Sequence, residues 1–458
     1  MIGSALFRPT RRADAVATRQ VKGIEMFARS CHPPIGLSKR PAHHPRARAV
    51  RLGGAAIGGL LAAASSLPLA ASASQIAHLR APAAPPPAQW RQQAAPALPQ
   101  YDLTSVSCPT DNFCVAVGAG GFGTGAPLAV SWDGVRWVRD TVPPSPTLVV
   151  RGAIAPSPIL DSVSCAAGGS CVAVGSSGSE VLHDGTWRTV AIADAKHAQL
   201  NSVSCWTANG CMAVGPSTIE MYDGSSWSLE HAQPLAGLSL AAVSCLIATI
   251  PDLCTAVGWA GSEQRYRPVA EHANGADWQV TNIPPGPSAT NAALESVSCP
   301  QPTSCVAVGS SVTTSSTKPE IAVPLVEIDQ LNHWTVAATP VLSNSTPVLR
   351  GLGVDPDLGY GLVGVSCGLT VEQCVGVGTI NGPSPGRAYL VEGSNGSSWA
   401  FQRLAHPPSF SGLDGVSCTP SPTNPTAPPI CTAVGSYAGM NPRPGPPNGP
   451  DMPLIIRN

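Results

Sequence analysis

One short pattern recurs seven times along this chain of 458 residues and contains fourteen of its fifteen cysteines. A clear copy is Ser162–Gly175, in which Ser-Val-Ser-Cys is followed after five residues by Cys-Val-Ala-Val-Gly. Internal repetition at a spacing of tens of residues is typical of solenoids, propellers and arrays. The seven copies begin at Ser105, Ser162, Ser202, Ala242, Ser296, Gly364 and Gly415.

Each repeat divides into four segments that favour short β-strands. Small and β-branched residues alternate in the two cysteine segments, which suits a half-buried pleated surface. A third apolar run follows, as in 126–132, and then a tight Asp-Gly or Asn-Gly turn, which supplies the positive φ angles of a two-residue hairpin. The fifth repeat lacks this glycine, so we expect a longer turn before Trp334. The fourth segment carries a tryptophan in six repeats: Trp137, Trp187, Trp227, Trp278, Trp334 and Trp399.

The spacing of the repeats favours a propeller over a solenoid. Equivalent cysteines lie 40 residues apart at their closest, from Cys165 to Cys205, which is the size of a four-stranded blade. The seventh repeat ends without a tryptophan segment, whereas Trp90 precedes the first repeat. A strand at Trp90 would therefore complete the last blade and remove an exposed sheet edge. The sequence predicts an all-β, seven-bladed β-propeller over residues 89–458, with four-stranded blades and an N-terminal strand that closes the last one.

The turn at Ser131–Trp137 resembles the Asp-box of BNR-type propellers, although it is one residue short of that spacing. The whole repeat is similar to a group of secreted bacterial β-propeller repeat proteins, over about residues 88–458. The resemblance implies a hairpin between the third and fourth strands and an extracellular setting, and it carries no activity with it.

The first 73 residues differ in composition from the rest. They hold eleven of the 26 basic residues and two of the 27 acidic ones, so the remainder is acidic. Basic residues, an apolar run over 52–70 and Ala71-Ser-Ala73 form the three parts of a secretory signal peptide. We expect residues 1–73 to be a leader and 74–88 to be an Ala/Pro-rich linker. An uncleaved leader that anchors the protein to the cell envelope stays the alternative, because the apolar run is nearly long enough to span a bilayer. The mature chain has no further segment of that kind.

Regularly spaced cysteine pairs in an exported protein indicate disulfides. Each pair flanks one hairpin, so we expect local pairing, with about 2 kcal/mol from each bridge on the chain-entropy model. Zinc is the competing reading, but seven dispersed pairs do not offer four clustered ligands. The predicted bridges are Cys108–Cys114, Cys165–Cys171, Cys205–Cys211, Cys245–Cys254, Cys299–Cys305, Cys367–Cys374 and Cys418–Cys431.

Familiar catalytic patterns lack their structural context here. The glycines at 118, 120 and 123 match a dinucleotide fingerprint, but a strand rather than a helix is expected after them. Ser384 lies between two prolines, which does not suit a nucleophile elbow. We therefore predict no catalytic residue, no metal and no cofactor. The acidic charge also argues against nucleic acid as a partner.

Binding residues are expected on the loops that vary most in length, because a rigid scaffold usually carries its ligand sites there. The segment 259–268 concentrates aromatic and charged side chains, which suit a sugar or a peptide through stacking and bidentate hydrogen bonds. We expect a monomeric, secreted, non-catalytic recognition or scaffold propeller. It would bind carbohydrate or protein on the face that carries these variable loops. An extracellular hydrolase or lyase with a glycosidase-like site at the propeller centre is the alternative. The candidate binding residues are Trp259, Glu263, Arg265, Tyr266, Arg267, Arg350, Tyr360 and Tyr437.

Overall fold

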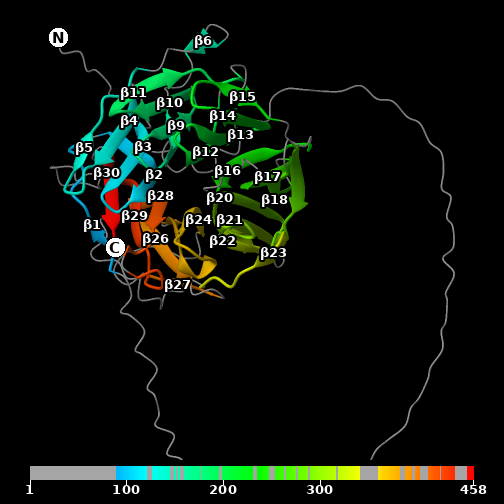
Figure 1. The fold of residues 1–458 in the computed structure, drawn as a ribbon. Helices are drawn as coiled ribbons and strands as arrows, with labels where there is room; N and C mark the ends of the chain where they lie inside the picture. The colour runs from blue at the N-terminus through cyan, green and yellow to red at the C-terminus, as the bar shows by residue number, and fades with distance from the viewer. Residues whose placement is uncertain are drawn as a thin grey trace, which may run out of the picture. The chain divides into compact units, whose positions relative to one another are not determined.

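The computed structural model contains seven four-stranded antiparallel sheets arranged in a ring, so the chain folds as a seven-bladed β-propeller (Figure 1). Among the described residues no helix is long and apolar enough to cross a membrane. The predicted leader and linker at 1–88 lie outside the described residues. The structure describes residues 89–98, 100–120, 126–144, 149–150, 153–154, 159–176, 178–194, 199–230, 235–246, 253–262, 265–274, 277–286, 289–315, 318–340, 359–381, 387–394, 398–402, 411–422, 424–438 and 451–458.

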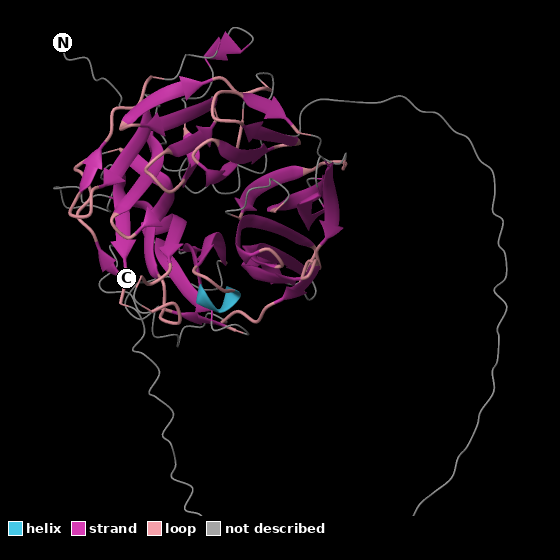
Figure 2. Cartoon of the chain, viewed as in Figure 1, coloured by secondary structure: helices cyan, strands magenta, loops and turns pink. Residues whose placement is uncertain are grey.

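The strands follow the repeats, four to a blade, and strands dominate the ribbon (Figure 2). In blades 1 to 3 they are β2 (Tyr101–Thr110), β3 (Phe113–Gly120), β4 (Pro127–Trp132), β5 (Trp137–Arg139), β8 (Leu160–Cys165), β9 (Cys171–Gly175), β10 (Gly178–His183), β11 (Thr186–Val190), β12 (Ser202–Thr207), β13 (Gly210–Gly215), β14 (Thr218–Tyr222) and β15 (Trp227–Leu229). In blades 4 and 5 they are β16 (Ser239–Cys245), β17 (Cys254–Ser262), β18 (Arg265–Asn274), β19 (Asp277–Asn282), β20 (Asn291–Gln301), β21 (Ser304–Ser315), β22 (Lys318–Gln330) and β23 (His333–Val336). In blades 6 and 7 they are β24 (Tyr360–Cys367), β25 (Cys374–Asn381), β26 (Arg387–Ser394), β27 (Trp399–Phe401), β28 (Ser411–Thr419), β29 (Ile430–Ala438), β30 (Asp451–Arg457) and β1 (Arg91–Gln92). A small hairpin, β6 (Val149–Val150) with β7 (Ala153–Ile154), and a 3-10 helix, η3 (Val371–Gln373), lie between these strands.

The first strand of each blade lines the middle of the ring. These strands contact one another in sequence order, and β28 of blade 7 contacts β2 of blade 1, so the ring is closed.

The predicted N-terminal closing strand is confirmed. β1 pairs antiparallel with β30, with Arg91 opposite Arg457 and Gln92 opposite Ile456. Trp90 is 1% exposed, and its Nε1–H donates to Gln402 Oε1 at 2.6 Å. The two ends of the chain therefore share one sheet, and no outer strand is missing from blade 7.

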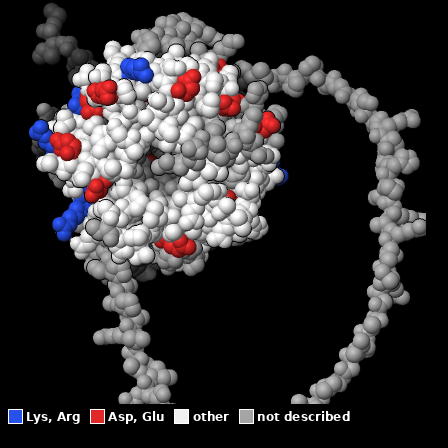
Figure 3. All heavy atoms as spheres, in the orientation of Figure 1, with Lys and Arg blue, Asp and Glu red and all other residues white. Residues whose placement is uncertain are grey.

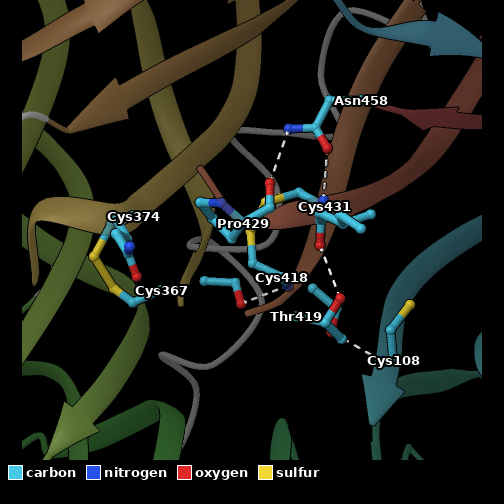
Figure 4. The surroundings of a disulfide bond; sticks show 12 residues. Cys108, Cys367, Cys374, Cys418, Thr419, Pro429, Cys431 and Asn458 are labelled. Carbon is cyan, nitrogen blue, oxygen red and sulfur yellow. Dashed lines mark hydrogen bonds between the residues drawn. A yellow bond between two sulfur atoms is a disulfide. The ribbon is translucent and has the colours of Figure 1, made fainter. Parts of the chain in front are cut away.

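The C-terminal residue, Asn458, also stabilises blade 7 through hydrogen bonds (Figure 4). The N–H of Cys431 donates to Asn458 Oδ1 at 2.7 Å, and Asn458 Nδ2 donates to the carbonyl of Pro429 at 3.4 Å. The guanidinium of Arg457 donates to the carbonyl of Asp111 in blade 1 at 2.7 Å. The end of the chain thus joins blade 7 to blade 1.

All seven predicted disulfides are present, between the cysteines of each first hairpin. The two cysteines face each other across the first and second strands, as Cys165 and Cys171 do, with Cα atoms 4.0 Å apart. Each bridge therefore closes the turn of its own hairpin.

The tryptophan of each blade packs against the second strand of the preceding blade. Trp187 lies in one buried cluster with Val115 and Val117 of β3, and Trp90 lies in another with Val375 and Val377 of β25. The other repeat tryptophans occupy the same place at the remaining interfaces: Trp137, Trp227, Trp278, Trp334 and Trp399. The core is thus a set of seven inter-blade layers.

The turn before Trp334 differs from our expectation of a longer loop. β22 and β23 are joined by two residues, because Gln330 pairs directly with His333. Leu331 and Asn332 both adopt positive φ, 58° and 63°, so the turn forms without glycine. Leu331 is 77% exposed, so this strained turn residue contributes no side chain to the core.

The glycine that ends each Cys-Val-Ala-Val-Gly segment sits opposite a bulge in the first strand. In blade 4, Gly258 pairs with Leu240, and the register then shifts before Ala242. A Cβ atom on Gly258 would overlap the carbonyl oxygen of Ser239. The equivalent glycines meet the same obstacle, so the repeat requires the absence of a side chain here. They are Gly118, Gly175, Gly215, Gly309, Gly378 and Gly435.

The serine that precedes each first-strand cysteine links neighbouring blades. The N–H of Cys165 donates to Ser107 Oγ of blade 1 at 2.9 Å, and equivalent bonds at 2.9 to 3.1 Å join all seven interfaces. The inner strand of a blade is a sheet edge whose outward N–H groups need partners. This serine belt supplies them from the adjacent blade. The serines are Ser107, Ser164, Ser204, Ser244, Ser298, Ser366 and Ser417.

Candidate binding face

The two rims of the ring carry different connections. Gly134, in the tryptophan turn of blade 1, lies close to Asn112 in the disulfide turn, and in blade 5 the N–H of Leu331 donates to the carbonyl of Thr303. Disulfide turns and tryptophan turns therefore share one rim. The opposite rim carries the connections between blades and the turns between second and third strands. We call it the variable-loop face.

Blades 4 and 5 project furthest from this face among the described strands. In blades 2 and 3 the second strand ends at the bulge glycine, Gly175 or Gly215. β17 continues four residues beyond Gly258 to Ser262, and β21 continues six beyond Gly309 to Ser315. At about 3.3 Å per residue these extensions rise about 13 Å and about 20 Å above the bulge level.

The segment 259–268, which the sequence analysis treats as a loop, is the end of a hydrogen-bonded hairpin. Trp259 pairs with Pro268, Gly261 with Tyr266 and Ser262 with Arg265. Aromatic side chains favour extended backbone, so pairing continues past the core of the blade. We call residues 259–262 and 265–268 the blade-4 hairpin.

The pleat of this hairpin divides the candidate residues between two sides. Paired residues share a side and alternate residues along a strand share a side, so Trp259 and Tyr266 lie together. Arg265 and Arg267, opposite Ser262 and Ala260, lie on the other side. The aromatic and cationic groups therefore do not converge as one cluster.

The aromatic side faces blade 5. Val257, two residues before Trp259, is buried with Leu294 of β20. The side chains of Trp259 and Tyr266 are half-buried. The N–H of Tyr266 donates to Asn291 Oδ1 at 3.1 Å, which ties the hairpin to the start of blade 5. This side offers two aromatic rings on a supported ribbon.

The arginine side faces blade 3. Ala260 is 2% exposed and packs in one cluster with Leu238, from the connection between blades 3 and 4. Arg265 and Arg267 extend beyond this contact and are exposed. Neither guanidinium has an ion pair with any of the described residues.

Prolines protect the free edge of these tall hairpins. The fourth strand of blade 4 ends at Asn282, opposite Val269, so β18 has no outer partner from Pro268 onward toward its start. Pro268 offers no N–H at that edge, and Pro324 holds the equivalent position in blade 5, opposite Ser310. Edge-to-edge pairing with another strand is therefore disfavoured here.

The remaining candidate residues lie elsewhere. Tyr360 is 5% exposed in the layer between blades 5 and 6, and its hydroxyl donates to the carbonyl of Pro340 at 3.1 Å. Tyr437 is half-buried against the core of blade 7. Glu263 and Arg350 lie outside the described residues, as does the segment around Ser384.

The structure also shows a row of buried glutamates that our sequence reasoning missed. They occupy one register position in the third strands of blades 2 to 5: Glu180, Glu220, Glu271 and Glu327. Each is at most 2% exposed. The sequence could have indicated them, because a glutamate recurs at a fixed position before the tight turn of these repeats. A glutamate in an otherwise apolar strand is unusual.

The surroundings of these carboxyls differ. Glu220 accepts hydrogen bonds at 2.9 Å from the N–H groups of Ala193 and Asp194, in the connection from blade 2. Glu271 and Glu327 have no hydrogen-bond partner among the described residues. Burial raises the pKa of Glu271 to about 7 and that of Glu327 to about 8. Burial also raises the pKa of Glu180 to about 7, although Thr189 donates to one of its oxygens.

A second set of polar side chains lies at the bulges of the inner strands. Thr104 Oγ1 donates to the carbonyl of Leu160 in the next blade, and Asn201 Nδ2 donates to that of Leu240, both at 2.7 Å. Asp161 and Glu295 occupy the same position in blades 2 and 5. Burial raises the pKa of both carboxyls, that of Asp161 to about 7. No group of three or more His, Cys, Asp or Glu in the described part of the chain could hold a metal ion.

Charged side chains are sparse on the side of the ring seen in Figure 3, and they lie mostly toward its periphery.

Comparison with solved structures finds similarities at low sequence identity. YCF48 bound to a D1 peptide matches with a TM-score of 0.45 and 12% identity, over 80% of this chain and 94% of that one. Sqt1 from Chaetomium thermophilum matches with a TM-score of 0.43 and 12% identity, over 73% of this chain and 80% of that one. The Cps50 (Swd1) β-propeller domain of Myceliophteria thermophila matches with a TM-score of 0.43 and 8% identity, over 80% and 99%. These likenesses concern the fold alone. No protein-family model and no curated protein sequence matches the chain.

Proposed function

We propose that this propeller is an exported, non-catalytic recognition protein that binds carbohydrate or protein through the blade-4 hairpin. One observation carries the proposal: a hydrogen-bonded ribbon projects beyond the short blade 3 and exposes two arginine side chains. Arg265 and Arg267 are exposed and form no ion pair with any described residue, and the side chain of Tyr266 is half-buried. Binding groups held on a rigid element lose less conformational entropy when a ligand docks.

Export is supported by the cysteines. Seven disulfides, one in each blade, suit an oxidising compartment, because thiols are kept reduced in the cytosol. The predicted signal peptide at 1–73 belongs to the same proposal. Fractionation of producing cells, with N-terminal sequencing of the extracellular protein, tests it; a reduced protein confined to the cytosol would refute export.

The test of binding is an array of glycans and peptides probed with the parent protein and with Tyr266→Ala. We expect specific signals from the parent that fall in the variant, because an aromatic group that stacks on a ligand usually contributes about 1–3 kcal/mol. Arg188→Ala, which changes an exposed side chain of blade 2, serves as the control. An array on which parent and Tyr266→Ala give the same pattern would refute this use of the hairpin.

The alternative function, an extracellular hydrolase or lyase, has one observation in its favour. Asp161 and Glu295 lie on the inner rim of the ring, and burial raises the pKa of both carboxyls, as in a general acid. A glycosidase and lyase panel with parent protein and Asp161→Asn decides the matter. Turnover that Asp161→Asn abolishes would replace the non-catalytic proposal.

A further inference from the structure

Arg265 and Arg267 form a pair of cationic side chains on one side of the blade-4 hairpin. They alternate along β18, so both point toward blade 3. Blade 3 extends less far than blade 4 on the variable-loop face, because only Pro216 and Ser217 join its second and third strands. The connection that packs on Ala260 leaves both arginines exposed. Both arginine side chains are therefore exposed on a hairpin that extends beyond the end of blade 3.

The spacing of the pair defines a ligand chemistry. Alternate residues of a strand are about 6.8 Å apart, twice the rise per residue. An extended peptide repeats its own side chains on one face at the same spacing. The planar guanidinium presents paired N–H donors that match both oxygens of a carboxylate. Two carboxylates at alternate positions of an extended peptide would thus meet Arg265 and Arg267 in register.

We propose that the blade-3 side of the blade-4 hairpin binds an extended acidic peptide segment with Asp or Glu at alternate positions. This inference rests on the proposed function and names its partner. The side chains would make the contacts, because the edge of β18 does not favour pairing with an added strand. Pro268 has no N–H, and the N–H of Tyr266 already donates to Asn291. The remainder of the chain after residue 73 has 15 basic against 25 acidic residues, so it repels long polyanions and favours a short acidic contact.

The probe is a fluorescein-labelled peptide of sequence Gly-Ser-Glu-Thr-Glu-Ser-Gly, measured by fluorescence anisotropy with the mature disulfide-bonded protein. We expect binding that weakens as salt rises, because the contacts are exposed charge pairs. Replacing both glutamates of the probe by glutamine should weaken binding about tenfold or more, and so should placing them at adjacent positions.

The matching protein variants are Arg265→Gln and Arg267→Gln. Each should weaken binding about tenfold, with the melting temperature unchanged because both side chains are exposed. Arg188→Gln is the control, since Arg188 is also exposed on a strand but lies in blade 2. Equal affinity of the arginine variants and the parent, or of the glutamine and glutamate probes, would overturn the proposal.

Two further outcomes separate this inference from the proposed function. If the parent binds other array ligands in a Tyr266-dependent manner but ignores the acidic probe, the acidic-peptide assignment is wrong and the binding function stands. If polygalacturonate displaces the probe at a lower concentration of carboxylate than free acidic peptide does, the partner is an acidic glycan and the assignment to a peptide is overturned.

Discussion

The hydroxyl of Ser164 in blade 2 accepts a hydrogen bond from the N–H of Cys205 in blade 3 at 2.9 Å. The same relationship recurs at every blade interface. The first serine of the repeat accepts an equivalent bond at four interfaces, as Ser162 Oγ does from the N–H of Val203 at 3.2 Å. The second serine is therefore the constant link in the ring. It explains why the repeat keeps a serine before each first cysteine.

Ser164→Ala should destabilise the protein by about 1–3 kcal/mol, because the N–H of Cys205 would lose its partner at a sheet edge. Ser162→Ala should cost less, since blade 4 has Ala242 at that position. Chemical denaturation with the disulfides intact measures both. A larger loss in Ser162→Ala than in Ser164→Ala would contradict the role of the belt.

Removing residues 85–100 should destabilise or aggregate the whole domain, because blade 7 would lose its outer strand. Trp90→Ala should cost about 3–5 kcal/mol, since the indole is fully buried between blades 6 and 7. Deletion of residues 74–84 is the control and should leave the melting temperature unchanged. A truncated protein that melts like the parent would show that closure does not stabilise the ring.

The stability of the protein should fall as pH rises from about 5 to about 8. The pKa of Glu327 is about 8 in the folded protein against an ordinary value of 4.5, and that of Glu271 is about 7. Between these values the unfolded chain releases protons that the folded protein keeps, so increasing pH favours unfolding. The stabilisation is complete below about pH 4.5 and is lost as pH passes the folded pKa values.

Glu327→Gln should flatten this pH dependence, because glutamine keeps the shape of the protonated carboxyl and does not ionise. Melting temperatures measured from pH 5 to pH 9 test it, with Glu220→Gln as the comparison. Glu220 already has two N–H donors, so its replacement should destabilise the protein at neutral pH instead. The same slope in parent and Glu327→Gln would rule out this glutamate as a cause.

The repeat pattern was sufficient to predict the blades and the disulfides, because each depends on features local in the sequence. The closing strand at Trp90 pairs with the far end of the chain, but the tryptophan segment missing from the seventh repeat indicated it. The serine belt depends on N–H donors of the neighbouring blade, which lie 41 or more residues away. The division of Trp259 from Arg265 depends on strand register. Residues that lie close together in the sequence can point to opposite sides of a hairpin, and only the strand pairing shows which of them share a side.

The most direct test of the binding proposal shortens the blade-4 hairpin to the form that blade 3 already has. Replacing residues 259–268 by Pro-Ser joins Gly258 to Val269 as Gly215 is joined to Thr218. The account predicts a folded protein with seven disulfides that has lost binding on the glycan and peptide array. A shortened protein that folds and binds as the parent does would contradict it.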